Sequence, residues 1–190
     1  MRLYLARHGE TEWSAARRHT GRTDVPLTSS GKEQARALGA ELAGVSLDRV
    51  LSSPLDRALT TARLAGFGGR VELSDALLEM DYGEFEGLTT REIRARRPGW
   101  DLFRDGCPSG ETVADVAERV RPLLGAIAGA GGNVLLFGHG HDLRVLAATF
   151  LGLEPAAARH LFLATGSVSI LGHEHDWPAI LCWNHTGGGL

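Results

Sequence analysis

Two runs of consecutive apolar residues, LYLA at 3–6 and VLLF at 134–137, constrain the fold of this chain more than any other feature. Neighbouring residues of a strand point to opposite faces of a sheet, so an unbroken apolar run predicts a strand covered on both faces. Strands of this kind are typical of parallel sheets. Val50-Leu51 predicts a third strand, and residues 167–171 and 179–183 predict two later ones.

Amphipathic helices are predicted between and after these strands. Capping-box patterns begin three of them, at 30–33, 89–92 and 112–115. Pro122 is predicted to kink or split the third helix. The apolar spacing in 143–150 predicts another helix, and Pro155 can open a short one after it. This alternation predicts an α/β layered fold with a mostly parallel central sheet.

The length and charge of the chain narrow the functional classes. We expect a single domain over residues 1–190, which is long enough to bury a sizeable core. The formal net charge of -3 argues against a broad basic surface for nucleic acid and against a polybasic membrane anchor. The N-terminal apolar run is too short for a signal peptide, and no stretch approaches the ~20 apolar residues of a membrane span. We therefore expect a cytoplasmic protein.

Both long apolar runs end at a histidine beside glycine. Arg7-His8-Gly9 follows the first run, and Gly138-His139-Gly140 follows the second. Carboxyl ends of parallel strands meet at one edge of a sheet, where ligands of α/β proteins bind. We therefore expect the two imidazoles to lie close together, beside backbone that the glycines leave open to a ligand.

Arg57 follows the third predicted strand by a few residues. Ser53 is predicted to cap the next helix, with Pro54 in its first position and Asp56 completing a capping box. Arg57 would then lie in the second turn, near the same edge of the sheet. Two arginines and two histidines at one place predict a phosphate site, because arginine holds phosphate through paired hydrogen bonds. An imidazole can act as the nucleophile in phosphoryl transfer, and arginines can supply the charge stabilisation that a metal supplies elsewhere.

Phosphoryl transfer also needs a proton for the leaving alkoxide. Glu79, Asp81 and Glu84 lie together in the segment LLEMDYGEFEG. The two leucines before Glu79 would favour its protonated form. The spacing alone does not choose among the three carboxyl groups.

These motifs resemble those of the histidine phosphatase superfamily, in its branch of phosphoglycerate-mutase-like phosphatases, and look most like the bacterial acid phosphatases of that branch. The resemblance covers nearly the whole chain and rests on LARHGETEW, HTGRTDVPLTSSG, LSSPLDRALTTA, LLEMDYGEFEGLT, RDGCPSGET, VLLFGHG and TGSVSIL. It implies a three-layer α/β/α sandwich and a metal-independent, two-step reaction through a phosphohistidine. It further implies that His8 takes up the phosphoryl group. Arg7, Arg57 and His139 would bind that group, and Glu79 rather than Asp81 would donate the proton.

The chain departs from the resemblance at two positions that border the expected pocket. Ser14 stands where many members have asparagine, and Gly138 stands where many have serine. Besides Arg7 and Arg57, substrate contacts are predicted at Ser14, Thr20, Gly21, Arg22 and Gly140. His141 is expected at the pocket rim or surface, Asp142 as a helix N-cap, and the arginines of 91–97 on a solvated helix face.

We expect a phosphomonoester hydrolase that acts on small phosphorylated metabolites without a cofactor or metal, with a homodimer as one possible assembly. A cofactor-dependent phosphoglycerate mutase is the nearest alternative. The resemblance disfavours it, because mutases of the family carry a longer basic segment after the acid glutamate than residues 79–112 provide. A metal-dependent hydrolase that uses His8, His139 and His141 is a second alternative. A phosphoryl-binding module without turnover is a third.

Overall fold

The two apolar runs lie side by side in a six-stranded sheet in the computed structural model, which describes residues 1–187. The strands are β1 (Arg2–Arg7), β2 (Arg49–Ser52), β3 (Val71–Leu73), β4 (Asn133–Gly138), β5 (Val168–Glu174) and β6 (Trp177–His185). Their order across the sheet is β3-β2-β4-β1-β5-β6. The pairs among the first four are parallel, whereas β5 and β6 pair antiparallel. The predicted mostly parallel sheet is confirmed.

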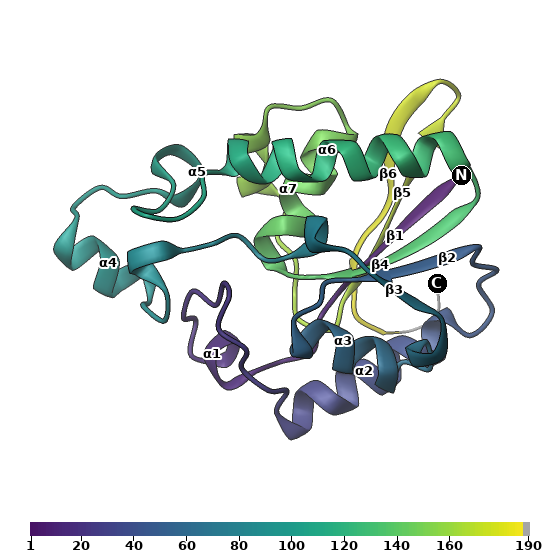
Figure 1. Cartoon of the computed structure of the whole chain (residues 1–190), viewed down its shortest axis with the longest axis horizontal. Helices are drawn as coiled ribbons and strands as arrows, with labels where there is room; N and C mark the ends of the chain where they lie inside the picture. Colours follow the sequence, from purple (N-terminus) through teal and green to yellow (C-terminus); the bar gives the residue numbers. More distant parts are fainter. Residues whose placement is uncertain (188–190) are drawn as a thin grey trace.

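Helices cover both faces of this sheet. The α-helices are α1 (Glu12–Ala15), α2 (Ser29–Leu42), α3 (Asp56–Leu64), α4 (Thr90–Arg96), α5 (Leu102–Asp105), α6 (Val113–Ala130) and α7 (Gly140–Phe150). The 3₁₀ helices are η1 (Gly68–Arg70), η2 (Asp75–Leu77), η3 (Gly83–Phe85) and η4 (Pro155–His160). Figure 1 shows α6 and α7 on one side of the sheet and α2 and α3 on the other, with α4 and α5 reaching away from it.

The alternating residues of β1 belong to two separate cores. Leu3 and Leu5 pack in the core that contains the buried faces of α6 and α7. Tyr4 and Ala6 pack in the core that contains the buried residues of α2 and α3. The unbroken apolar run is therefore buried on both faces, as its pattern predicted. The three-layer α/β/α sandwich is confirmed.

Of the helix starts predicted at 30–33, 89–92 and 112–115, two are confirmed and one is wrong. Thr89 and Thr112 each cap their helix, with a reciprocal bond from the residue three positions later. Ser30 does not cap α2, because Thr28 does: its backbone is extended and its hydroxyl accepts the N–H of Gly31. Ser30 already lies inside the helix.

Pro122 does not split α6, which continues from Val113 to Ala130. The helix is held on both sides of the proline by buried residues such as Val116, Val120 and Ile127. This packing outweighs the missing N–H of the proline. The sequence also gave no sign of β3, a strand of three residues in which two side chains are exposed.

The register of the sheet brings the predicted site residues to one edge. Arg7 lies opposite Gly138 in the pairing of β1 with β4, and the N–H of His8 donates to the carbonyl of Gly138 (3.0 Å). The N–H of Ser53, just after β2, donates to the carbonyl of Phe137 (2.9 Å). The three strand ends thus meet, as expected from parallel pairing. None of the helices described within residues 1–187 combines the length and the apolar character that spanning a membrane requires.

Candidate active site

A cavity of about 480 Å³ opens beyond the carboxyl ends of β1 and β4. The predicted site residues among its lining are Arg7, His8, Ser14, Thr20, Glu79 and Gly140. Arg57 and His139 are fully buried next to it and are not part of the exposed lining. The strand-end histidines lie together, with ring centroids of His8 and His139 5.2 Å apart. The predicted convergence of these side chains is therefore present.

His8 is held as a neutral imidazole. Its Nδ1 lies 2.7 Å from the carbonyl oxygen of Gly9, which can only accept, so Nδ1 carries the proton and Nε2 keeps its lone pair. Burial lowers the pKa of His8 well below its usual value, and the positive charges of Arg57 and Arg7 lower it further. At neutral pH the imidazole therefore keeps a free lone pair on Nε2, which a nucleophile requires.

Arg57 lies in the first turn of α3, because that helix begins at Asp56 and not after Ser53 as predicted. Leu55 occupies the N-cap position without a side-chain bond. Both terminal nitrogens of Arg57 donate to backbone carbonyls of the preceding loop, those of Thr20 (3.1 Å), Gly21 (2.7 Å) and Thr23 (2.9 Å). Its Nε is buried and has no partner among the described residues.

Ser53 holds His139 in place of capping the helix. The N–H of Leu55 donates to Oγ of Ser53 (3.3 Å), and the same oxygen lies 2.8 Å from Nε2 of His139. The Ser53 hydroxyl can donate its proton to Nε2, and in that arrangement the imidazole proton lies on Nδ1. That Nδ1 is buried and has no partner within residues 1–187.

Around the cavity, three buried donors have no partner among the described residues: Nε of Arg7, Nε of Arg57 and, in this tautomer, Nδ1 of His139. Arg7 uses Nη1 to bind the carbonyl of Leu163, which leaves its Nε free. Buried donors of folded proteins are nearly always paired, so orphaned ones call for an explanation. An oxyanion such as phosphate, with several acceptor oxygens, would satisfy all three.

Glu79 is the predicted acid that lines the cavity; Asp81 and Glu84 are not part of that lining. Its carboxylate lies at the N-terminus of α7, where it accepts the N–H groups of His141 (3.2 Å) and Asp142 (3.0 Å). Its surroundings are thus more polar than the two preceding leucines indicated. These bonds fix its orientation, and the helix dipole favours an acidic side chain there.

The glycines of the second strand end are needed for close packing. A Cβ on Gly140 would lie 3.3 Å from Cζ of Arg7, so a larger residue would press on the guanidinium. A Cβ on Gly138 would lie 2.7 Å from Oδ2 of Asp142. Asp142 is fully buried, and its pKa is raised by burial and by the charge of Glu79, so a Cβ at position 138 would press on a buried carboxyl group.

Asp142 was predicted as the N-cap of α7, and this is wrong. His139 is the N-cap, and Asp142 lies in the first turn, where its Oδ1 accepts the N–H of His139 (2.7 Å). The three-residue spacing is that of a capping box, in which the acidic member follows the cap.

The other predicted contacts divide between the cavity and its supporting loop. Ser14 lines the cavity and closes a capping box with Thr11 at the start of α1. Gly21 lies behind the lining, with its N–H bound to Glu86 and its carbonyl to Arg57. Arg22 is outside the lining, and its guanidinium pairs with Glu111 at 3.5 Å. The arginines of 91–97 are exposed and lie outside the cavity, as expected of a solvated face.

Sequence reasoning missed part of the lining. Four arginines and two glutamates contribute to it, so the cavity carries an excess of positive charge; the arginines are Arg7, Arg17, Arg18 and Arg144. Tyr82 and His19 also line it. Their spacing in the sequence carries no signal, because they come from separate loops that only the tertiary fold brings together. His141, predicted at the rim, lines the cavity as well.

No group of three or more His, Cys, Asp or Glu side chains within residues 1–187 is arranged to hold a metal ion. His8, His139 and His141 therefore do not form such a group.

Two relatives of known name align with nearly the whole chain. An acid phosphatase of Mycobacterium tuberculosis is 41% identical over 190 residues, which covers 98% of this chain and 93% of that protein. A protein of Salmonella choleraesuis named a probable phosphoglycerate mutase is 33% identical over 190 residues, which covers 94% of this chain and 88% of that protein.

Solved structures agree with the fold. The product of an open reading frame of Mycobacterium tuberculosis superposes with a TM-score of 0.93 at 39% identity and covers 98% of both chains. A mycobacterial glucosyl-3-phosphoglycerate phosphatase, solved with VO3, superposes with a TM-score of 0.86 at 30% identity. That alignment covers 96% of this chain and 98% of the other.

The sequence profile of the histidine phosphatase superfamily (branch 1) matches residues 3–186. This match spans the strand ends, the buried arginines and the cavity described above. Together with these relatives it establishes that the chain belongs to branch 1 of the histidine phosphatase superfamily.

Proposed function

We propose that this chain hydrolyses small phosphomonoesters in two steps through a phosphohistidine at His8. The observation that carries the proposal is the set of three buried, unpartnered donors on Arg7, Arg57 and His139. These donors lie in the same buried cluster of side chains as His8, whose neutral imidazole has a free Nε2. A phosphoryl group is the ligand that would satisfy these donors and react with that nitrogen.

In the first step Nε2 of His8 attacks phosphorus and the bond from phosphorus to the ester oxygen breaks. Glu79, once it has taken up a proton from solvent, gives that proton to the leaving alkoxide. In the second step Glu79 removes a proton from water, which attacks the phosphohistidine. Inorganic phosphate leaves, and His8 returns to its neutral form. The donors of Arg7, Arg57 and His139 stabilise the charge on the equatorial oxygens in both steps.

Trapping the covalent intermediate tests this sequence. With 4-nitrophenyl phosphate, whose leaving group needs no proton, Glu79→Gln should be phosphorylated but lose its base for the second step. Acid-free mass spectrometry should then show one added phosphoryl group that accumulates on His8. His8→Ala should show neither the added mass nor turnover, whereas His160→Gln, at an exposed histidine outside the cavity, serves as the control. Retained turnover in His8→Ala would overturn the proposal.

Similarity to a protein named a probable phosphoglycerate mutase keeps mutase activity as the second candidate. It differs from the first in the acceptor of the phosphoryl group. Incubation with 3-phosphoglycerate and a bisphosphoglycerate primer should release inorganic phosphate and form no 2-phosphoglycerate. Formation of the isomer at a rate above hydrolysis would favour the mutase.

The remaining sequence predictions are proposals with direct tests. Catalysis without a metal predicts the same turnover with and without a chelator, and restoration by a divalent ion would contradict it. Turnover of a phosphomonoester would also separate the enzyme from a binding module. Light scattering measures whether the chain is a homodimer, and cell fractionation tests the cytoplasmic location.

A further inference from the structure

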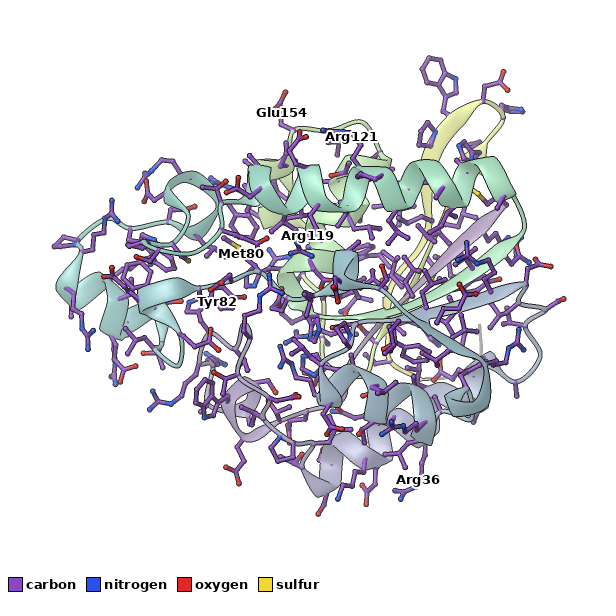
Figure 2. All side chains as sticks on the ribbon, in the orientation of Figure 1. Arg36, Met80, Tyr82, Arg119, Arg121 and Glu154 are labelled. Carbon is purple, nitrogen blue, oxygen red and sulfur yellow. The ribbon has the colours of Figure 1, made fainter. Side chains whose placement is uncertain are left out.

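The cavity contains a pair of side chains that the two reaction steps do not use. The hydroxyl of Tyr82 lies 2.6 Å from Nδ1 of His141, and both residues line the cavity. Tyr82, labelled in Figure 2, is 2% exposed. Burial raises the pKa of Tyr82 well above its usual value and lowers the pKa of His141 well below its own. Both groups are therefore neutral at neutral pH.

The contact fixes which nitrogen of His141 carries the proton. The bond to Nδ1 is the one hydrogen bond that residues 1–187 offer to the Tyr82 hydroxyl. A buried phenol has a single proton, which therefore goes to this nitrogen. Nδ1 of His141 is the acceptor, so the imidazole proton lies on Nε2. Nε2 of His141 is not one of the buried polar atoms that lack a partner among the described residues. It therefore remains accessible to a ligand as a donor.

The backbone of His141 lies beside the acid of the proposed reaction. The backbone N–H of His141 lies 3.2 Å from each oxygen of Glu79, the group proposed to protonate the leaving oxygen. Other rings surround the imidazole, with centroids of His19 at 6.2 Å and Phe103 at 5.6 Å. The imidazole of His141, whose backbone adjoins the acid, therefore presents a fixed N–H donor among aromatic rings at the cavity.

We propose that Nε2–H of His141 donates a hydrogen bond to a hydroxyl oxygen of the leaving alcohol, with Tyr82 as the positioning residue that holds its tautomer. The cavity then selects phosphate esters of polyhydroxy alcohols over esters of purely apolar alcohols. An apolar alcohol leaves this donor unpaired in a partly dry site, which costs binding free energy in the transition state. The inference rests on the proposed phosphatase activity.

A matched pair of substrates tests the inference. Glycerol 3-phosphate and propyl phosphate have the same carbon chain, and only the first carries further hydroxyl groups. For the wild-type enzyme we expect kcat/KM to favour glycerol 3-phosphate about tenfold, the contribution of one such hydrogen bond. His141→Leu should bring this ratio close to one, and Tyr82→Phe should lower it part of the way.

Two further variants separate the donor from a structural effect. His141→Gln places an amide N–H near the position of Nε2 and should restore most of the preference. His160→Leu, at an exposed histidine outside the cavity, should keep the wild-type ratio. Each value is the ratio of kcat/KM for the two substrates, measured on the same variant. A partial loss of folded enzyme lowers both values equally and leaves the ratio unchanged.

The failures can be told apart. A wild-type ratio near one, or an unchanged ratio in an active His141→Leu enzyme, overturns the leaving-group contact while hydrolysis itself continues. No hydrolysis of either ester by the wild-type enzyme, together with no phosphohistidine, overturns the proposed phosphatase and this inference with it.

Discussion

Each side chain of the proposed phosphate site is held by the protein through some of its nitrogens and keeps one free. Arg57 gives both terminal nitrogens to the loop carbonyls of residues 20–23 and keeps Nε. His139 gives Nε2 to Ser53 and keeps Nδ1. The free donors are thus fixed before a ligand arrives, and donors that need no reorganisation stabilise transition-state charge most effectively.

This arrangement predicts that Arg57 cannot be replaced by lysine. An ammonium group has no planar fork, so Arg57→Lys cannot bind the loop carbonyls and a phosphate oxygen in the same geometry. We expect kcat/KM for 4-nitrophenyl phosphate to fall by about 10²–10³, as for the loss of one oxyanion donor. Arg36→Lys, on the exposed side of α2 in Figure 2, is the control and should keep the wild-type value. A loss of less than about threefold at position 57 would remove Arg57 from the phosphate site.

Ser53 is predicted to act through His139. In Ser53→Ala the imidazole loses the hydroxyl that holds its proton on Nδ1, and the oxygen that accepts the N–H of Leu55 is lost as well. We expect kcat/KM to fall about tenfold and orthovanadate to bind more weakly by a similar factor, from the loss of about one net hydrogen bond. Inhibition by orthovanadate measures the second effect. A lower melting temperature with unchanged vanadate affinity would show that Ser53 only stabilises the fold.

The sequence predicted which residue types meet at the strand ends but not which of their atoms stay free. Arg7, His8 and His139 could be placed because strand register is regular, and an apolar run marks where each strand ends. The tautomer of His139 depends on Ser53, which is 86 residues away along the chain. Such a partner has no local signature. For the same reason, the pairing of Tyr82 with His141 could not be foreseen.

At the scale of single elements, α6 contains Pro122, a residue that disfavours the helical conformation. Pro122 lacks an N–H and crowds the carbonyl four residues earlier, yet it lies exposed in the middle of the helix. Pro122→Ala should therefore raise the free energy of unfolding by about 2 kcal/mol, since ~3 kcal/mol of helix cost is partly offset by the stiffer unfolded chain. Urea unfolding followed by circular dichroism measures this change.

The same helix offers an internal comparison. Gly125 is exposed, and a Cβ on it would meet nothing within 4 Å, so Gly125→Ala should stabilise by about 1 kcal/mol through helix propensity alone. A stabilisation at Pro122 no larger than at Gly125 would mean that the helix bends at the proline without strain.

Helix starts were predictable at two capping patterns and failed at three others, those of α2, α3 and α7. Thr89 and Thr112 cap as expected. Thr28 and Ser30 both have suitable side chains, and Thr28 prevails because its backbone N–H already binds the carbonyl of Glu10 (2.9 Å). That bond comes from the strand-to-helix connection and not from the helix itself. A tertiary contact therefore decided the boundary.

At the scale of the whole molecule, burial of neutral histidines ties stability to pH. Burial lowers the pKa of His8, His19, His139 and His141. Below about pH 6.5 the unfolded chain binds protons at these residues that the folded chain does not, so stability falls as the pH falls. Asp142 acts in the opposite direction, because burial raises its pKa. The folded protein should therefore lose stability over the same acidic range in which His8 stays neutral.

His19 isolates one of these contributions. Burial lowers its pKa from 6.5 to about 4, which corresponds to about 3 kcal/mol of stability at neutral pH. Replacing it by glutamine removes the proton while leaving an amide that can bind Thr90, the present partner of its Nε2 (3.2 Å). The free energy of unfolding of wild type minus that of His19→Gln should be constant above pH 6.5 and should fall by up to about 3 kcal/mol as the pH drops to 4. Urea titrations at half-unit steps of pH give this difference directly. If this difference does not change with pH, His19 takes up its proton in the folded state as readily as in the unfolded chain. The cavity wall then does not lower the pKa of His19.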